Sequence, residues 1–132
     1  MIIVAHCKKL KMKKSIFFVL IGLLPIVSFG QKFTSGACMS LGTQAKYESK
    51  IEISDTLFTI TDANTGNMVK YKVVSKSMNN NSYLLTDGVR DIVADIQFYE
   101  KPPVKVKGTA YHVWITLTIN NTPFTYFAEK EM

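Results

Sequence analysis

Side chains that commonly carry catalysis are sparse in this sequence. After position 30 it contains one histidine, His112, and one cysteine, Cys38. A histidine base needs a positioned nucleophile or an orienting partner, and a zinc site of the usual spacing needs several histidine or cysteine ligands. We therefore interpret His112 as one half of a cross-strand charge pair with Glu129, and we predict neither a metal site nor a cofactor.

Carboxylates are densest between Asp87 and Asp95, a stretch that also contains Arg90. Asp91 and Asp95 share one face of a predicted strand, where a rise of about 3.4 Å per residue separates them by roughly 13 to 14 Å. Carboxyl groups that act jointly as acid and base lie about 5 to 9.5 Å apart, so this pair is too widely spaced. Asp87 and Arg90 are typical of a turn closed by a side-chain bond. A calcium site would need six or more oxygen ligands.

The sequence also lacks a glycine-rich phosphate loop, a nucleophile elbow and a cofactor fingerprint. These gaps argue against an enzyme. One catalytic alternative stays open, a hydrolase in which His112 works with one of the aspartates. The candidate polar site for that alternative comprises His112, Glu129, Asp87, Arg90 and Asp91.

The strongest pattern is an alternation of apolar and polar residues over 111–119, followed by Asn120 and Asn121. Two asparagines can adopt the left-handed backbone of a two-residue type I′ turn. The resulting hairpin register pairs Trp114 with Phe127 on one face. The other face is apolar and comprises Tyr111, Val113, Ile115, Leu117, Ile119, Phe124, Tyr126 and Ala128.

Aromatic residues on this hairpin form our candidate binding patch. If the apolar face turns inward, Trp114 and Phe127 become an exposed aromatic pair, and otherwise Tyr111 and Tyr126 lie outside. Contiguous exposed apolar surface marks interaction sites, so we assign the patch to these four residues. The alternative is an ordinary cross-strand aromatic pair that the segment 31–46 covers.

Period-two alternation also runs through most of the remaining chain and predicts short strands. Turn clusters rich in Asn, Asp and Gly separate these runs at 62–67, 79–81 and 86–88. Because no convincing helix is available to cover an open sheet, we expect an all-β antiparallel meander of about seven or eight strands. It would form a small sandwich or a closed barrel, which would be lipocalin-like in architecture only, since no diagnostic motif of that group is present.

The first 30 residues have the pattern of an export signal. Five lysines precede an apolar stretch, 16–29, that is too short for the roughly 20 residues of a bilayer span. Small residues precede a signal peptidase site after Gly30. We predict a signal peptide over 1–30, with Met12 as an alternative start, a flexible lead-in over 31–46 and a single β domain over 47–132.

Removal of the leader changes the charge of the protein. Five of the 16 basic residues lie before Gly30 and all 10 acidic ones lie after it, so the remaining chain is nearly neutral. We therefore predict no nucleic-acid partner, which would require a clustered basic face. The one local basic group, Lys101, Lys105 and Lys107, is interpreted as a solvated strand edge.

These observations favour a non-catalytic binding module that is exported, either periplasmic or secreted. Its partner would be a protein or a glycan in the envelope or outside the cell. It would meet a membrane only if the leader is retained or Cys38 is lipidated. The main alternative is a small barrel that carries an apolar ligand in a cavity lined by Tyr71, Ile96, Ile115 and Tyr126.

Overall fold

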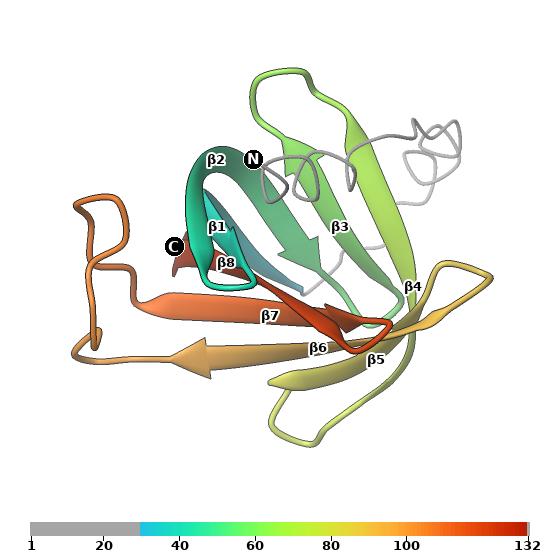
Figure 1. The fold of residues 1–132 in the computed structure, drawn as a ribbon. Coiled ribbons are helices and arrows are strands. Elements are labelled where there is room, and N and C mark those ends of the chain that lie inside the picture. The colour runs from blue at the N-terminus through green and yellow to red at the C-terminus, as the bar shows by residue number, and fades with distance from the viewer. Residues whose placement is uncertain (1–29, 132) are drawn as a thin grey trace.

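A computed structural model describes residues 30–131, which contain eight strands joined in sequence order (Figure 1). Each strand pairs antiparallel with the next, and β1 also pairs with β8, so the sheet closes into a barrel. The predicted all-β meander is confirmed, and of the two architectures it is the barrel; the predicted signal peptide lies outside the described residues. The strands are β1 (Gln31–Ser40), β2 (Thr43–Ile53), β3 (Leu57–Asp62), β4 (Met68–Lys76), β5 (Ser82–Thr86), β6 (Asp91–Phe98), β7 (Val113–Ile119) and β8 (Thr122–Lys130).

The segment 31–46, predicted as a flexible lead-in, instead forms β1 and the start of β2. Phe33 and Cys38 of β1 point into the barrel and are fully buried. The prediction was wrong because a β-bulge between Ser35 and Ala37 shifts the register and interrupts the alternation. The correction matters for the fold, since β1 is the strand that joins β2 to β8.

The C-terminal hairpin has the predicted register. Asn120 and Asn121 adopt φ values of 52° and 65°, as a type I′ turn requires, and Trp114 lies opposite Phe127. The pairing of β8 with β1 ends at Phe124, so Pro123 lies just beyond it and its missing N–H interrupts no ladder bond.

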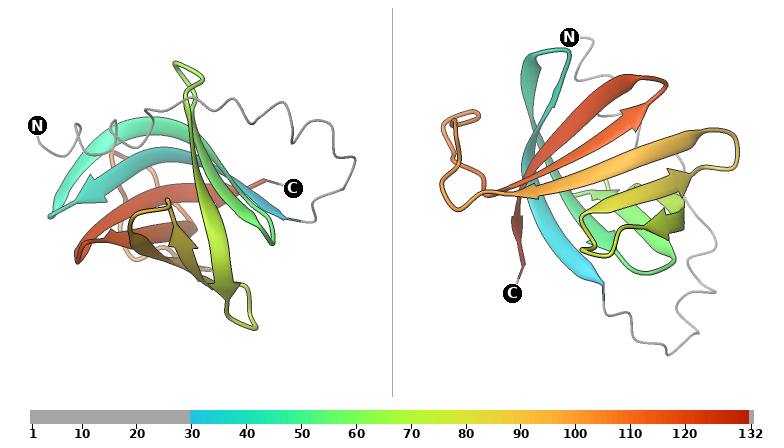
Figure 2. Two further views of the ribbon diagram at one scale, coloured as in Figure 1. Left: turned by 90° about the vertical axis from the view of Figure 1, so that its right-hand side faces the viewer. Right: turned by 90° about the horizontal axis from the view of Figure 1, so that it is seen from below.

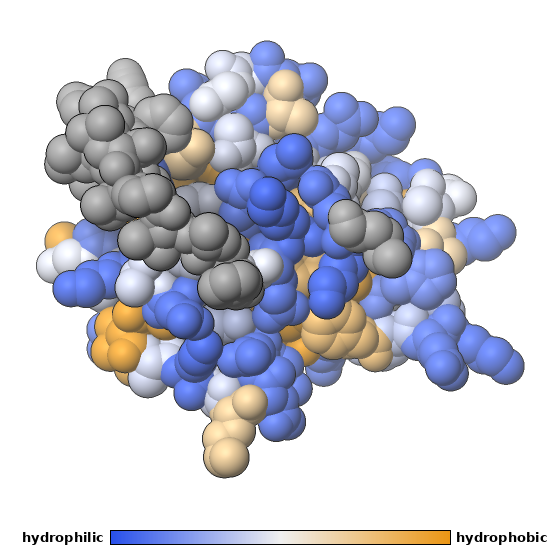
Figure 3. All heavy atoms as spheres, turned by 180° about the vertical axis from the view of Figure 1, so that it is seen from behind, coloured by the Kyte–Doolittle hydropathy of each residue, from blue (hydrophilic) through white to orange (hydrophobic). Residues whose placement is uncertain are grey.

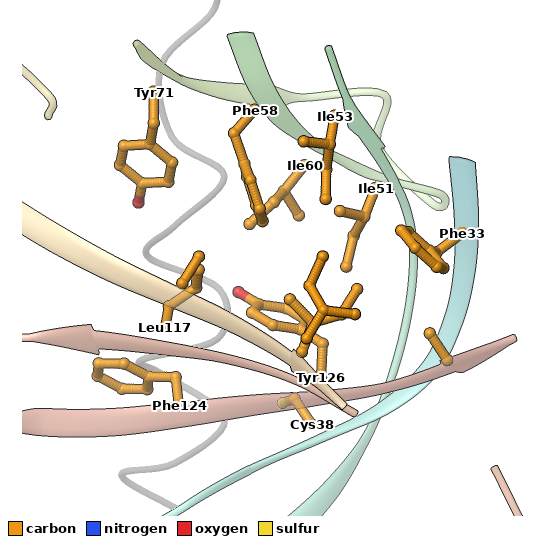
Figure 4. Close-up of a cluster of buried hydrophobic side chains, with 14 of the residues drawn as sticks. Phe33, Cys38, Ile51, Ile53, Phe58, Ile60, Tyr71, Leu117, Phe124 and Tyr126 are labelled. Atoms are coloured by element: carbon orange, nitrogen blue, oxygen red, sulfur yellow. The ribbon is translucent and has the colours of Figure 1, made fainter. Parts of the chain in front are cut away.

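Apolar side chains from all eight strands fill the barrel interior (Figure 4). Phe33, Phe58, Leu117 and Tyr126 are among the largest of them, and all four are fully buried. A closed barrel of eight strands is just wide enough to be filled in this way. Burial of this interior face is the main source of stability, because the outward faces of most strands are polar.

Antiparallel order places alternate connections at opposite ends of the barrel (Figure 2). One end carries the β4–β5 turn and the 14-residue connection between β6 and β7, which we call the flap (99–112). Gly30 and Glu131 also lie at this end, which we call the flap end. Within residues 30–131 no helix is long and apolar enough to cross a membrane.

Candidate functional site

Four aromatic rings form a cluster on the outer wall of the barrel. Trp114 packs edge-on against Phe127, with ring centroids 5.0 Å apart and an interplanar angle of 85°. The Tyr99 ring packs at a tilt against Trp114, with centroids 4.9 Å apart, and the Tyr111 ring lies 6.2 Å from that of Phe127. Tilted and edge-to-face contacts at these distances are the favourable arrangements of aromatic pairs, so the cluster is a stable feature of the wall.

The flap folds back over part of this cluster. Val106 is fully buried against Phe127 and Ala37, and a bridge between Val106 and Thr109 closes the flap into a small hairpin. A Cβ built on Gly36 would lie 2.4 Å from the Tyr111 hydroxyl. The lack of a side chain at Gly36 therefore lets the tyrosine lie close against β1.

This arrangement corrects the predicted patch in three respects. Tyr111, predicted on the same strand face as Tyr126, instead packs against Phe127 on the outer wall, because β7 begins only at Val113. Phe127 is only 1% exposed although it points away from the barrel interior. Val106 of the flap covers it together with Ala37 and Met39 of the segment 31–46, so the alternative of a covered aromatic pair holds for Phe127. Tyr126 points into the barrel and is fully buried, so it lies on the opposite side of the wall from Trp114. The part of the cluster that solvent reaches consists of the half-buried rings of Tyr99, Tyr111 and Trp114.

Several polar groups of this surface have partners within the chain. The Trp114 indole N–H donates to the Tyr111 carbonyl at 3.2 Å. His112 contacts Glu129 through Nδ1 at 2.9 Å, and its backbone N–H donates to the same carboxylate, so the predicted cross-strand pair is confirmed. The accessible remainder of the cluster is therefore mainly aromatic ring surface.

The candidate polar site does not assemble. His112 is the last residue of the flap and Glu129 lies opposite it on β8, whereas Asp87 and Arg90 lie in the β5–β6 turn and Asp91 begins β6. The eight residues of β6 separate the two groups by about 25 Å at ~3.3 Å per residue. Among the described residues no three His, Cys, Asp or Glu side chains gather as metal ligands would. The hydrolase alternative therefore gains no geometric support.

Asp87 and Arg90 form the predicted side-chain-closed turn. The guanidinium donates to Asp87 Oδ2 at 2.8 Å, and the backbone N–H groups of Val89 and Arg90 donate to Oδ1. Partial burial pushes the pKa of Asp87 upward, but the hydrogen bonds and charge of Arg90 outweigh it and lower the pKa to about 2. This carboxylate stays ionised in its structural role.

Interior polar groups form a second feature that the sequence patterns did not indicate. Tyr47 and Asp62 are buried inside the barrel, where Asp62 accepts the N–H groups of Asn64 and Thr65 at 2.8 and 2.9 Å. Burial, together with the charge and a hydrogen bond of Asp62, raises the pKa of Tyr47 above its usual range. The sequence did contain a signal for this buried pair, because Tyr47 and Asp62 occupy inward positions of their strands. Polar residues at such positions, however, look like breaks in the alternation of apolar and polar residues.

Alkaline pH is expected to unfold the protein through its interior tyrosines. Burial raises the pKa of Tyr71 to about 12 and that of Tyr126 well above its usual range. Such groups stabilise the folded state fully below the unfolded-state pKa of about 10, and that contribution is lost as the pH rises through the folded-state pKa. Denaturant unfolding at a series of pH values should show the free energy of unfolding fall above about pH 10. A free energy that stays flat up to about pH 12 would contradict this expectation.

The chain was compared with known proteins at three levels. No protein-family model, no curated protein and no solved structure matches it. The arrangement of its own residues is therefore the basis for the functional proposal.

Proposed function

We propose that the protein is an exported, non-catalytic binding module that contacts its partner through the half-buried rings of Tyr99, Tyr111 and Trp114. The observation that carries this proposal is the aromatic cluster itself, which lies on the outer wall of a barrel whose interior is packed. Tryptophan and tyrosine are enriched at the energetic centres of protein interfaces. We therefore assign the partner as a protein of the envelope or the extracellular space, and a glycan is the competing outcome.

A partner at this site would meet a preformed surface. Phe127 and Val106 hold the rings from beneath, and the Trp114 N–H is already bonded to the Tyr111 carbonyl. Pre-organised side chains lose little conformational entropy on binding, which favours affinity. The buried base of the cluster thus supports its accessible edge.

Site-specific cross-linking is the experiment that tests the proposal. A photoreactive phenylalanine analogue placed at Tyr99 is expected to give one discrete adduct in envelope extract, whereas the analogue at Val93 gives none. Val93 is a matched control because its side chain also points outward and is 41% exposed, but it lies outside the cluster. Excess wild-type protein should compete for the adduct, and the Trp114→Phe variant should compete about five- to thirtyfold less well, in line with losses of about 1 to 2 kcal/mol at interface residues.

Competition by unlabelled protein distinguishes cross-links to a specific partner from cross-links formed by chance encounters. Equal adducts from Tyr99 and Val93, or full competition by the Trp114→Phe variant, would contradict a binding site at the cluster. An adduct that glycosidase treatment removes would identify a glycan as the partner.

An apolar carrier is the second candidate, and one observation favours it. Within the described part of the chain, the Tyr126 hydroxyl and the side-chain oxygens of Ser40 and Ser49 are buried without a hydrogen-bond partner. Such atoms are rare in folded proteins and often contact water or a ligand. Against this candidate, Tyr71, Ile96 and the other residues expected to line the cavity are at most 3% exposed.

The Tyr126→Phe variant distinguishes the two candidates. Removal of a buried hydroxyl that lacks a partner is expected to raise the free energy of unfolding by about 1 kcal/mol, because its desolvation cost disappears. Denaturant unfolding measures this gain, and binding at the outer cluster should be unchanged. A carrier would instead lose ligand affinity in this variant, and a loss of stability would indicate that the hydroxyl has a partner.

A further inference from the structure

The flap end of the barrel is a contiguous surface built from several connections. The Gln31 side-chain amide donates to the Asn80 carbonyl of the β4–β5 turn at 3.2 Å. The Ile96 N–H donates to the Asn81 carbonyl at 2.8 Å, and the ring of Phe98 lies 6.3 Å from that of Phe33. The start of β1, the β4–β5 turn and the end of β6 therefore adjoin one another, and the flap continues directly from β6.

Ion pairs at this end leave its lysines in excess. Three carboxylates are matched by lysines, in the pairs Lys32 with Glu52, Lys50 with Glu131 and Lys76 with Asp55. Glu129 contacts His112, which carries a charge only when protonated, and Asp95, opposite Ser82, is exposed and in none of these pairs. Among the described residues, Lys101, Lys105, Lys107 and Lys130 are exposed and belong to no ion pair. Glu100 is the one acidic residue of the flap. The flap itself, with three lysines and one glutamate, is thus locally basic although the chain from 31 onward is nearly neutral.

Large apolar side chains project from the same end. Met78 in the β4–β5 turn is 98% exposed, Phe98 is 53% exposed and Val104 on the flap is 50% exposed. Figure 3, in which the side bearing the flap lies at the right, shows strongly hydrophilic side chains projecting there. Val104 is adjacent to Lys105 in the flap, whereas Met78 projects separately from the β4–β5 turn of the same end. Exposed apolar side chains and unpaired lysines on one surface are the combination found on peripheral proteins at a lipid interface.

We propose that the flap end docks onto the surface of an anionic lipid membrane. Lysines are attracted to acidic headgroups, and every one to two lysines raise the membrane affinity about tenfold. Exposed apolar side chains raise it further by entering the boundary between headgroups and acyl chains. A soluble polyanion would use the lysines but would have no use for Met78 and Val104. The lipid surface therefore accounts for both kinds of residue, and this inference does not depend on the aromatic cluster.

Vesicle co-sedimentation tests the inference. The protein, produced from the full chain, is mixed with vesicles of phosphatidylcholine alone or of phosphatidylcholine with phosphatidylglycerol. All variants are made in the same background, so that any contribution of residues 1–29 is common to them. The wild-type protein is expected to bind the anionic vesicles preferentially, and high salt should weaken this binding because it screens exposed charges.

Two sets of substitutions separate the contributions of charge and apolar contact. The triple variant Lys101→Gln, Lys105→Gln, Lys107→Gln should bind anionic vesicles about a hundredfold more weakly. The double variant Met78→Ser, Val104→Ser should also weaken binding. Val89→Ser is the matched control, because Val89 is 88% exposed in the β5–β6 turn at the opposite end of the barrel. All these side chains are exposed, so the barrel should fold in each variant, which circular dichroism verifies.

The outcomes are distinct. Loss of vesicle binding in both sets, with normal binding by Val89→Ser, supports docking through the flap end. Absence of binding, equal binding to neutral vesicles or normal binding by the triple lysine variant would overturn it. Heparin serves as a soluble polyanion for comparison. If the double variant Met78→Ser, Val104→Ser binds anionic vesicles as well as the wild type does, and both proteins also bind heparin, the result would overturn membrane docking in favour of a soluble polyanion.

Discussion

Replacement of Phe127 by alanine is expected to destabilise the protein by about 3 kcal/mol, although the side chain points away from the barrel interior. The reason is that Phe127 is 1% exposed and is enclosed by Trp114, Tyr111 and Val106. Truncation removes its transfer energy and opens a cavity between the flap and the wall. Denaturant unfolding of the variant measures the loss.

The control for this prediction is Val93→Ala. Val93 also faces outward, but it is 41% exposed, and a substitution there should change stability by only about 0.5 kcal/mol. Similar small changes in the two variants would mean that the flap does not cover the wall in solution. The Phe127→Ala variant should also be cleaved more readily within the flap, because Val106 loses its main contact.

Phe58→Ala is expected to have the largest effect on stability, a loss of about 4 to 5 kcal/mol. Phe58 is fully buried inside the barrel, and its ring centroid lies 6.5 Å from that of Tyr71 and 6.4 Å from that of Tyr83. The site is closed by strands on all sides, so it has less freedom to collapse than the space beneath the flap.

Thr61→Ala on the same strand provides the comparison, because Thr61 points outward and is only half-buried. Thermal and denaturant unfolding should show that the Phe58→Ala variant is far less stable than the Thr61→Ala variant. A cost below about 1 kcal/mol for Phe58→Ala would contradict the inward orientation of β3.

The strands of the C-terminal half could be predicted because β6 and β7 have a period of two, and the Asn120–Asn121 turn fixes the register of β8 against β7. The faces of β6, β7 and β8, the Asn120–Asn121 turn and the Asp87–Arg90 turn all rest on local patterns that neighbouring residues reinforce. Closure of the barrel was one of two expected architectures, since sandwiches and barrels share the same alternation. β1 was missed because its bulge breaks that alternation.

The candidate site was predicted only in part, for a physical reason. Local register places Trp114 opposite Phe127, but the packing of Val106 against Phe127 depends on how the flap returns to the wall. The flap contains two prolines and a single buried valine, so its sequence has no periodic pattern that would predict its packing against the wall. Tyr126 was grouped with the outer aromatics although the register already placed it on the interior face.

The central claim is that the outer aromatic cluster binds a partner, and native mass spectrometry of the protein purified gently from its envelope fraction tests it most directly. We expect the wild-type protein to carry a stoichiometric non-covalent partner, and the Tyr99→Ala variant, prepared in parallel, to have lost it. Tyr99 lies at the accessible edge of the cluster, so its removal should leave the barrel folded. A complex that survives unchanged in Tyr99→Ala would contradict the claim. So would a wild-type protein that holds only a small molecule, released on denaturation and lost in Tyr126→Phe.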